Sequence, residues 1–488
     1  IGYMGIMIPY ATYSQNGTFP LRNFAGYTNI TYIIENTQTI NSGTKITIPA
    51  GMSFKFGSIT AFDVQGRLDV SGTAASPVIF TNLSDDSYGN PLDLQTDGNA
   101  STPYNSGYPA FNFGDVANDS SVINYAIIRY TNYGIYCTSS SPSITNCIFN
   151  KCNYGVTMNG TAAPVVDNNQ FQNLYRTPLY TSIISYPSSA ANNSISGTTW
   201  KAIGIINETL SQDATLPKRN FGGYTNIPYY FQGFTVGTTA TLTIQPGVTT
   251  KWSGNMYVQK GLNAIGGVRA DSNIVFTSIK DDYYGGDMNS DSTSTDAYQS
   301  DWGGIEFQDV SIDPLCKMKN CIFRYCYTAI NTTNASPDIQ KCTFMNVYSQ
   351  GLYASGSSNP TINYCDFYLN PNNSYYYGVN NVNQSFVINA ENNWWGNNSG
   401  PTHTGNASGT GSKSTDAVDY LPFRTTGPNN PIAGDVSQNG TVQAYDAALI
   451  LQSLVNTITL STSQQAVADV SGNGSVTALD ASQILQYN

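Results

Sequence analysis

The chain has 488 residues, only 10% of them charged, and a formal net charge of −11 at pH 7. This charge argues against nucleic acid as a partner, because phosphates attract basic proteins, and it favours metal cations as ligands. No apolar run approaches the ~20 residues that a membrane-spanning helix needs, so the sequence predicts no membrane span. The first residue is Ile1, and Asn, Ser and Thr are abundant. Either a signal peptide has been removed or the chain is a fragment, and the composition favours the first. We therefore expect a secreted, extracellular or cell-surface protein, and sequons such as Asn16-Gly17-Thr18 leave glycosylation open.

A short phrase recurs at steps near 22 residues. Asn320-Cys321-Ile322-Phe323 returns as Lys341-Cys342-Thr343-Phe344 and as Tyr364-Cys365-Asp366-Phe367. Such a period, with β-rich runs between Gly, Asn and Ser, is typical of a solenoid in which each repeat is one stacked coil. Few residues of this segment favour helices, whereas Asn, Thr, Tyr and Ile favour strands and turns. The sequence therefore predicts a parallel β-helix.

The whole pattern occurs twice. Phe80-Thr81 returns 196 residues later as Phe276-Thr277, and the phrase from Pro20 to Ile30 returns from Pro217 to Ile227. We therefore predict a tandem duplication of one β-helix module. The predicted boundaries are 1–199 for the first module, 200–424 for the second module with a segment covering its end, 425–431 for a linker and 432–488 for a C-terminal domain.

The eight cysteines follow the coil period. Zinc sites need clustered Cys-x₂₋₄-Cys pairs, which this spacing does not provide. We expect Cys321, Cys342 and Cys365 to stack as an inward ladder. Cys147 holds the matching place in the first module, where we expect Tyr125 and Asn169 as coil neighbours and no thiol partner. The sequence favours small buried core residues, and the disulfide state stays open.

A polar insert rich in acids follows the Phe-Thr phrase of each module. Clustered carboxylates on a loop repel one another unless a cation lies among them. The sequence therefore predicts calcium here, against the alternative of a solvated acidic loop. The candidate ligands are Asp85, Asp86, Asp93 and Asp97 in the first insert, and Asp281, Asp282, Asp287, Asn289 and Asp291 in the second.

Several phrases resemble those of a known family of secreted proteins. The Asp-Asp-x-Tyr-Gly start of the insert, Asp301-Trp302-Gly303-Gly304-Ile305 and Asn393-Trp394-Trp395-Gly396 resemble right-handed parallel β-helix repeat proteins of prokaryotic cell surfaces. The resemblance covers residues 1–424 and implies an all-β right-handed parallel β-helix. Because that family implies polysaccharide lyases, adhesins and surface proteins alike, the fold does not select a function.

The C-terminal segment contains two twelve-residue loops 34 residues apart, Asp435 to Asp446 and Asp469 to Asp480. Both carry oxygen-bearing side chains at positions 1, 3, 5 and 12 and glycine at position 6. A hard Ca²⁺ ion needs such ligands, and the glycine permits the sharp turn. We expect an apolar helix after each loop, over residues 447–455 and 481–485.

Paired loops that end in Asp and precede one helix each resemble a dockerin module, over residues 432–488. The resemblance implies two Ca²⁺ ions and a cohesin-like partner or a neighbouring subunit. It implies as ligands Asp435, Ser437, Asn439, the Thr441 carbonyl and Asp446 in the first loop, and Asp469, Ser471, Asn473, the Ser475 carbonyl and Asp480 in the second. It also implies that loop positions 10 and 11 face the cohesin. These positions are Ala444-Tyr445 in the first loop and Ala478-Leu479 in the second.

No pattern predicts catalytic residues. His403 is the single histidine and has no acid nearby in the sequence, so a Ser-His or Cys-His system depends on this one loop residue. Arg129 with Arg324, and Lys55 with Lys251, recur in matching positions. Since a catalytic site is seldom needed twice, this recurrence favours a structural role.

We therefore expect a secreted, non-catalytic structural protein, a β-helix rod with a calcium-dependent docking module. One alternative is a polysaccharide-active enzyme of an extracellular complex, such as a Ca²⁺-dependent lyase or a glycoside hydrolase. Another is a carbohydrate-binding adhesin that uses Trp394, Trp395 and the run Tyr375-Tyr376-Tyr377. Because the stretch from Tyr3 to Ile8 has no charge or early proline, we also expect it to pair with a neighbouring subunit in a filament or layer, unless a removed segment capped it.

Overall fold

The computed structural model describes residues 2–98, 100–267, 270–292, 294–368, 376–428, 433–437, 442–471 and 473–486. The chain divides into two compact units. Unit 1 comprises Ile1–Ile206, Arg219–Tyr230 and Gly285–Thr295, and unit 2 comprises Asn207–Lys218, Phe231–Tyr284 and Asp296–Asn488. The module boundaries drawn from the sequence stay predictions.

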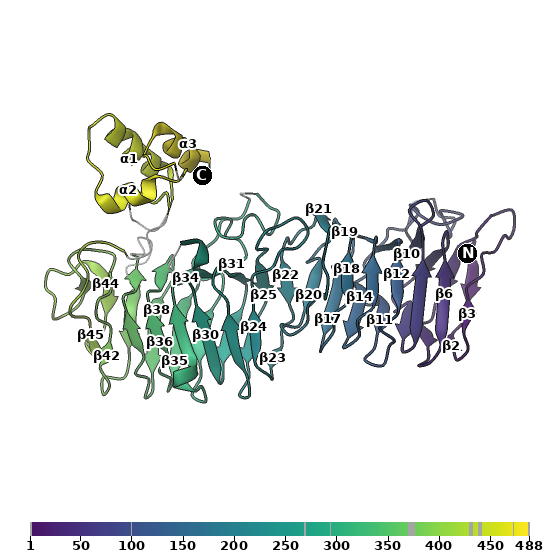
Figure 1. The fold of residues 1–488 in the computed structure, drawn as a ribbon, viewed down its shortest axis with the longest axis horizontal. Coiled ribbons are helices and arrows are strands. Elements are labelled where there is room, and N and C mark those ends of the chain that lie inside the picture. The colour runs from purple at the N-terminus through teal and green to yellow at the C-terminus, as the bar shows by residue number, and fades with distance from the viewer. Residues whose placement is uncertain are drawn as a thin grey trace. The chain divides into compact units, whose positions relative to one another are not determined.

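Unit 1 is built from short parallel strands, which Figure 1 shows in purple to blue. Its described residues form three sheets. In sheet order these are β1 (Ile6–Ile8), β4 (Tyr32–Ile34), β7 (Ser53–Phe56), β10 (Val78–Asn82), β13 (Ala126–Arg129), β16 (Ile148–Asn150), β19 (Gln170–Gln172) and β21 (Ser194–Ser196); β2 (Ala11–Tyr13), β5 (Gln38–Ile40), β8 (Phe62–Val64), β11 (Pro109–Phe113), β14 (Tyr133–Thr138), β17 (Tyr154–Asn159), β20 (Leu179–Thr181) and β22 (Ile203–Ile205); and β18 (Val165–Asp167), β15 (Ser143–Thr145), β12 (Val122–Asn124), β9 (Arg67–Ser71), β6 (Lys45–Pro49) and β3 (Gly17–Thr18).

Unit 2 repeats this architecture. Its sheets contain β28 (Thr249–Trp252), β31 (Ile274–Ser278), β34 (Cys321–Arg324), β37 (Thr343–Met345) and β40 (Asp366–Phe367); β23 (Thr209–Leu210), β26 (Phe234–Val236), β29 (Asn255–Val258), β32 (Gly304–Phe307), β35 (Thr328–Thr333), β38 (Gln350–Ser355), β41 (Tyr377–Asn381), β44 (Gly411–Ser414) and β43 (Pro401–Thr402); and β24 (Ala214–Leu216), β27 (Thr241–Ile244), β30 (Gly261–Ile265), β33 (Cys316–Lys319), β36 (Asp338–Gln340), β39 (Thr361–Asn363), β42 (Ile388–Asn389) and β45 (Val418–Asp419). Strand β25 (Tyr229–Phe231) contains a unit boundary, and two short 3₁₀ helices cover Ala270–Ser272 and Asp313–Leu315.

Each coil contributes one strand to each of three sheets, as the 22-residue period predicts. In unit 1, β13, β14 and β15 of one coil pair in parallel with β16, β17 and β18 of the next. In unit 2, β34 pairs in parallel with β37, and β37 with β40. The predicted parallel β-solenoid is confirmed, while its right-handedness stays a prediction.

The recurring phenylalanines form a ladder in the interior. Phe323, Phe344 and Phe367 are fully buried, and successive ring centroids lie 5.3 and 5.0 Å apart in stacked orientation. Phe149 and Phe171 stack in the same way in unit 1, at 5.0 Å. Stacked coils place equal side chains above one another, so each ring buries its faces against its neighbours.

The residue that opens the recurring phrase lies at a left-handed turn. Asn146, Asn168 and Asn320 have φ values of 56°, 58° and 50°, and Lys341 and Tyr364 have 52° and 57°. Asn tolerates this conformation better than most residues with a side chain. The backbone turn therefore explains why Asn recurs at the start of so many coils.

The cysteines lie in the core as predicted. All eight are buried and free, and the Cys342 N–H donates to Cys365 Sγ at 3.4 Å. The Cys147 N–H donates to Asn169 Oδ1 at 2.8 Å, which confirms one expected neighbour. The other expected neighbour, Tyr125, was wrong. The register Ile127↔Ile148 places Ala126 opposite Cys147, because this step is 21 residues and not 22.

The described residues of the C-terminal region include three helices, α1 (Ala444–Leu454), α2 (Thr462–Ala468) and α3 (Ala478–Gln486), drawn in yellow in Figure 1. Their small core contains Val436, Ala447, Ile450, Leu460, Val467, Ala468, Ala481 and Ile484. Among the described residues, no helix has both the length and the apolar character that crossing a membrane requires.

Candidate calcium-binding and docking site

The second C-terminal loop brings most of its predicted ligands together. The Ser471 hydroxyl donates to Asp469 Oδ1 at 3.3 Å, and the Ser471 N–H donates to Asp480 Oδ1 at 2.9 Å. The N–H groups of Asn473 and Gly474 donate to the two oxygens of Asp469 at 3.1 and 2.8 Å. The loop thus curls around the Asp469 carboxylate, with positions 1, 3 and 12 linked by hydrogen bonds.

Asn473 and Ser475 lie at the exposed side of this loop. The Ser475 N–H donates to Asn473 Oδ1 at 2.9 Å, so position 5 accepts a bond from position 7. The predicted ligand at position 7 is the Ser475 carbonyl, which this bond does not use. Position 6, Gly474, has a φ of +85°, the left-handed conformation that glycine adopts without strain.

The first loop has the same arrangement in its described part. The Ser437 N–H donates to Asp446 Oδ1 at 2.6 Å, and the Ser437 hydroxyl donates to Asp435 Oδ1 at 3.2 Å. Asp435 and Asp446 are buried. The other two predicted ligands, Asn439 and Thr441, lie outside the described residues. The two loops therefore agree at positions 1, 3 and 12.

Position 12 of each loop also belongs to the first turn of a helix. Helices α1 and α3 begin at Ala444 and Ala478, inside the loops and three residues before the expected starts. Asp446 Oδ2 accepts a bond from the Gln443 N–H at 2.9 Å, and Asp480 Oδ2 accepts one from the Thr477 N–H at 2.8 Å. A carboxylate in the first turn satisfies N–H groups that the helix leaves unpaired.

Hydrogen bonds make Asp480 a stronger acid. Burial of the carboxyl group raises its pKa, but bonds from the backbone and side chains of Ser471 and Thr477 outweigh this effect and lower the pKa to about 2. The carboxylate is therefore ionised at neutral pH, as a cation ligand must be. Thr477 was not among the predicted site residues, although Thr-x-x-Asp is a recognisable capping signal.

Helix α2 was also missing from the expected elements. The Ser461 side chain caps it by accepting a hydrogen bond from the Gln464 N–H. The Gln464 side chain in turn accepts a hydrogen bond from the Ser461 N–H. The Ser-x-x-Gln signal in the sequence could have found this helix. Gln464 also donates to the Val436 carbonyl at 2.9 Å, which joins α2 to the first loop.

The residues at loop positions 10 and 11 face outward, as expected. Tyr445 is 57% exposed and Leu479 is 53% exposed, and both follow an exposed alanine. Leu451 and Leu485, six residues further along each helix, are 44% and 48% exposed. Exposed apolar residues in equivalent positions of two repeats indicate a protein interface.

The first acidic insert brings together three of its four candidate ligands. Carboxylate oxygens of Asp86, Asp93 and Asp97 all lie within 4.8 Å of one another. Each of these three residues also has a buried oxygen without a hydrogen-bond partner. Burial raises the pKa of Asp86, and Asp93 and Asp97 raise it further. Lys55 Nζ lies 4.0 Å from Asp86 Oδ1.

Asp85 takes a different role from its neighbour. It is 1% exposed, its Oδ2 lies 2.9 Å from Arg129 Nε, and it accepts a bond from the Thr81 hydroxyl. Asp281 repeats these contacts in unit 2, with Arg324 at 3.2 Å and the Thr277 hydroxyl at 2.5 Å. The recurring arginines thus form buried ion pairs, which supports the structural role expected for them.

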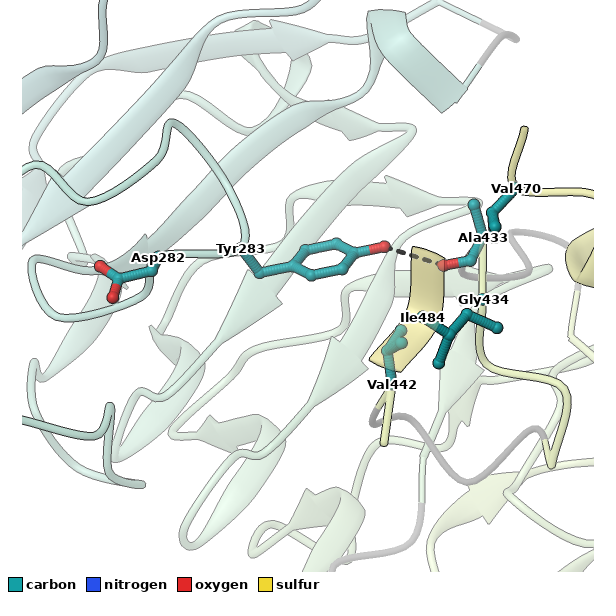
Figure 2. A pocket seen from close by; sticks show the side chains of 7 residues that line it. All are labelled: Asp282, Tyr283, Ala433, Gly434, Val442, Val470 and Ile484. Carbon is teal, nitrogen blue, oxygen red and sulfur yellow. Dashed lines mark hydrogen bonds between the residues drawn. The ribbon is translucent and has the colours of Figure 1, made fainter. Parts of the chain in front are cut away.

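The candidate ligands of the second insert are divided between the two units. Asp287, Asn289 and Asp291 belong to unit 1, where Asn289 donates to Asp291 at 2.7 Å. Asp281 and Asp282 belong to unit 2. The Tyr283 hydroxyl donates to the Ala433 carbonyl at 3.0 Å, and Figure 2 shows the Asp282 carboxylate turned away from that bond. A calcium site in this insert stays a prediction.

Three of the aromatic residues considered for an adhesin surface are buried, and Tyr377 is partly exposed. Trp395 is fully buried and stacks on Phe367 at 5.0 Å, and Trp394 and Tyr376 are 8% and 4% exposed. Tyr375 lies outside the described residues. His403 Nε2 lies 3.6 Å from Asp416 Oδ1, so the fold supplies an acid that the sequence did not place near it.

Comparison with known proteins identifies the C-terminal region. Residues 433–487 match the dockerin type I domain family. No curated protein and no solved structure shows a significant match to the chain. Dockerin type I domains bind calcium and attach to cohesins, and their proteins are typically extracellular or on the cell surface. The chain is thus a parallel β-solenoid that carries a C-terminal dockerin type I domain.

Proposed function

We propose that this protein is a secreted, non-catalytic component of an extracellular complex, held there by calcium-dependent docking of its dockerin domain to a cohesin. The repeated arrangement of positions 1, 3 and 12 in the two loops carries this proposal. In each loop a serine links the first and the last carboxylate. These oxygens are ligands that Ca²⁺ prefers.

Each loop takes one Ca²⁺ ion in this proposal. Asp469, Ser471, Asn473 and Asp480 hold one ion with the Ser475 carbonyl. Asp435, Ser437 and Asp446 hold the other, with Asn439 and the Thr441 carbonyl completing the set. Two carboxylates in each loop balance the charge of one divalent ion. Because Asp446 and Asp480 also cap α1 and α3, an ion held there fixes the helices that present the docking residues.

Measured cohesin affinity tests this proposal. The full chain is titrated with a panel of cohesin modules in calcium and in excess EGTA. We expect binding in calcium, its loss in EGTA, and its loss after Asp446→Ala combined with Asp480→Ala. Asp309→Asn is the matched control, because Asp309 is exposed and lies outside the dockerin domain. Equal affinity in calcium and in EGTA would contradict calcium-dependent docking.

The solenoid has a structural role in this proposal. The basic residues that recur in both units are used in the fold: Arg129 and Arg324 pair with buried aspartates, and the Nζ groups of Lys55 and Lys251 donate to the carbonyls of Leu92 and Asp281. A base committed to such contacts is not available for proton abstraction. Incubation with pectic and other polysaccharides, with and without calcium, is expected to yield no new reducing ends or unsaturated products. Product formation that His403→Ala abolishes would contradict the non-catalytic role.

A further cation in the first acidic insert is part of the proposal. Asp86, Asp93 and Asp97 together with Lys55 leave two negative charges, which suits one divalent ion. Calorimetric titration with Ca²⁺ is expected to show one fewer bound ion after Asp93→Asn combined with Asp97→Asn. Asp115→Asn, a change at an exposed aspartate, is the control. An unchanged number of bound ions would contradict this cation site and favour the alternative, a solvated acidic loop.

A further inference from the structure

A cleft lies on the outer face of unit 2, over β29, β32, β35 and β38. Its lining includes Asn255, Glu306, Tyr327, Asn331, Gln350 and Tyr353. Its volume of about 350 Å³ lies within the ~300–1,000 Å³ of typical small-ligand sites. None of these residues belongs to the dockerin domain or to the acidic inserts.

Strand register aligns the polar side chains of the cleft in a row. Glu306 is opposite Tyr257 on one side and Asn331 on the other, and Asn331 is opposite Tyr353. Neighbouring parallel strands lie about 4.8 Å apart, so this row offers one side chain per coil at a constant step. Tyrosines therefore flank a carboxylate and an amide along the row.

Two glycines of the lining, Gly303 and Gly304, allow neighbouring groups to approach the backbone closely. A Cβ atom on Gly303 would lie 1.9 Å from Asn255 Oδ1, and one on Gly304 would lie 1.7 Å from the Thr328 carbonyl oxygen. Gly304 also has a φ of +108°, which residues with a side chain rarely adopt. A side chain at position 304 would therefore overlap the backbone of the neighbouring strand, and only glycine fits there.

The walls are held in place by contacts within the protein. Tyr327 is 50% exposed, and its ring lies 5.3 Å from that of Tyr348. The Thr328 hydroxyl donates to Gln350 Oε1 at 2.8 Å, so the Gln350 amide nitrogen is the end that can donate to a ligand. Gln308 donates to Glu306 at 3.3 Å. The cleft is therefore preformed, which lowers the entropic cost of binding.

The chemistry of the lining favours a neutral, hydroxyl-rich ligand. Among the ten described residues that line the cleft, Glu306 is the sole charged one. A phosphate or carboxylate ligand would meet no Lys, Arg or His in this lining and would be repelled by Glu306. Tyrosine faces stack on flat rings, and amides and carboxylates exchange hydrogen bonds with hydroxyl groups. Both features suit the sugar rings of a neutral glycan.

A polypeptide ligand fits this surface poorly. Binding of a peptide strand needs a free sheet edge, but β32 pairs with β29 and β35, and β35 pairs with β38. Binding of an amphipathic helix needs an apolar groove. The one aliphatic residue of the lining, Ile305, is buried.

Unit 1 does not repeat these residues at the same place in its fold. Strand β11 follows the first insert as β32 follows the second. In unit 1, Pro109 and Ala110 occupy the positions that Gly303 and Gly304 have in unit 2. Asn112 stands in the place of Glu306, opposite Asp63 and Tyr136. The core aromatics and the arginine–aspartate pairs recur in both units, whereas this outward row differs. The different residues of this outward row indicate a specialised role for the unit 2 face.

We propose that this cleft binds a neutral oligosaccharide or polysaccharide segment, with Tyr327 and Tyr353 against the sugar rings and Glu306, Asn331 and Gln350 bonded to hydroxyl groups. The cleft binds its ligand and does not cleave it. Glycoside hydrolysis uses a pair of carboxyl groups, and the described lining holds Glu306 alone.

Binding of defined hexasaccharides tests this inference. The full chain in calcium is titrated calorimetrically with cellohexaose, xylohexaose, mannohexaose and maltohexaose, and with hexagalacturonate as the anionic probe. We expect at least one neutral hexasaccharide to bind and hexagalacturonate not to bind. Tyr353→Ala and Tyr327→Ala are each expected to lower the affinity by about tenfold, the scale of one lost aromatic contact.

The matched control is Tyr298→Ala, which removes a 63% exposed tyrosine outside the cleft and is expected to leave the affinity unchanged. Cohesin binding and the melting temperature of every variant are measured to show that fold and docking are retained. The inference is overturned if no neutral hexasaccharide binds, if both cleft variants bind like the control, or if hexagalacturonate binds as tightly as the neutral probes. Docking through the dockerin domain does not depend on any of these outcomes.

Discussion

Arg324 and Asp281 form a buried ion pair, with Nη1 3.2 Å from Oδ2, although 43 positions separate them in the sequence. Their side chains are 7% and 3% exposed. Asp281 lies in the acidic insert, whereas Arg324 ends β34 of a regular coil. The pair therefore ties the insert to the solenoid. Burial alone lowers the pKa of Arg324, but the attraction of Asp281 raises it on balance, so the arginine remains charged.

Replacing Asp281 with Ala is expected to lower the unfolding free energy of unit 2, because Asp281 has a structural role. The change leaves Arg324 buried without its counter-ion, which costs about 3–5 kcal/mol of unfolding free energy. Urea unfolding followed by tyrosine and tryptophan fluorescence measures the loss. Asp309→Ala, at an exposed position of the same unit, is the control. If Asp281→Ala unfolds at the same urea concentration as this control, the pair has no structural importance.

The solenoid was predictable because its signals are periodic. Cys321, Cys342 and Cys365 recur at steps of 21 and 23 residues, and the fold stacks them and the phenylalanines that follow. The one misplaced neighbour, Tyr125 for Ala126, comes from a coil that is one residue shorter. A period fixes which residues face inward, but a single-residue change in coil length shifts the register without altering the pattern.

The functional surfaces were predictable only where ligands are close in sequence. The calcium loops could be recognised because positions 1 to 12 of each loop are consecutive in the sequence. The different roles of Asp85 and Asp86 could not be recognised, because they depend on Arg129, which lies on a later coil and pairs with Asp85 alone. The glycan cleft depends on the register of four strands from four coils, and no short motif records such an alignment.

The unfolding free energy of unit 1 is expected to depend on pH in part through Asp69. Burial raises the pKa of Asp69, but hydrogen bonds from Arg67 and Lys45 outweigh this and lower the pKa below the ordinary 3.8. The unfolded chain then binds the proton more tightly, so the stabilisation is complete above pH 3.8 and is lost as the pH falls through the lower, folded-state value.

Asp69→Asn tests this contribution. We expect it to lower the unfolding free energy at pH 7 by about 1–3 kcal/mol, and the difference from the native chain to shrink below pH 3.8 as Asp69 itself becomes protonated. Urea unfolding at several pH values provides the measurement, with Asp115→Asn as the exposed control. A difference that stays constant from pH 7 to pH 2 would exclude Asp69 as the titrating group.

The cohesin-facing surface is expected to depend on both loops of the dockerin domain. Tyr445 and Leu479 occupy equivalent positions and are both more than half exposed. Removing a central aromatic or aliphatic anchor weakens an interface by about 1–3 kcal/mol. Tyr445→Ala and Leu479→Ala are therefore expected to lower cohesin affinity by at least tenfold when combined. Tyr298→Ala is the control, and unchanged affinity of the double variant would place the interface elsewhere.

Calcium removal is expected to unfold the dockerin domain before the solenoid. The domain spans residues 433–487, and so small a core has marginal stability without its ions. Two bound ions would stabilise the folded state by mass action, and excess EGTA removes that contribution. Without an ion, the Asp435 and Asp446 carboxylates repel each other, as do those of Asp469 and Asp480.

Hydrogen exchange of the full chain measures this order of unfolding. In EGTA, the amides of α1 and α3 should exchange at the rate of an unfolded segment, while those of β34, β37 and β40 keep their protection. The native chain in EGTA is compared with two samples in calcium, the native chain and the Asp446→Ala, Asp480→Ala double variant. The variant should exchange in calcium as the native chain does in EGTA. Full protection of α1 and α3 in EGTA would show that the helices need no ion, and the proposed ligand set would then be wrong.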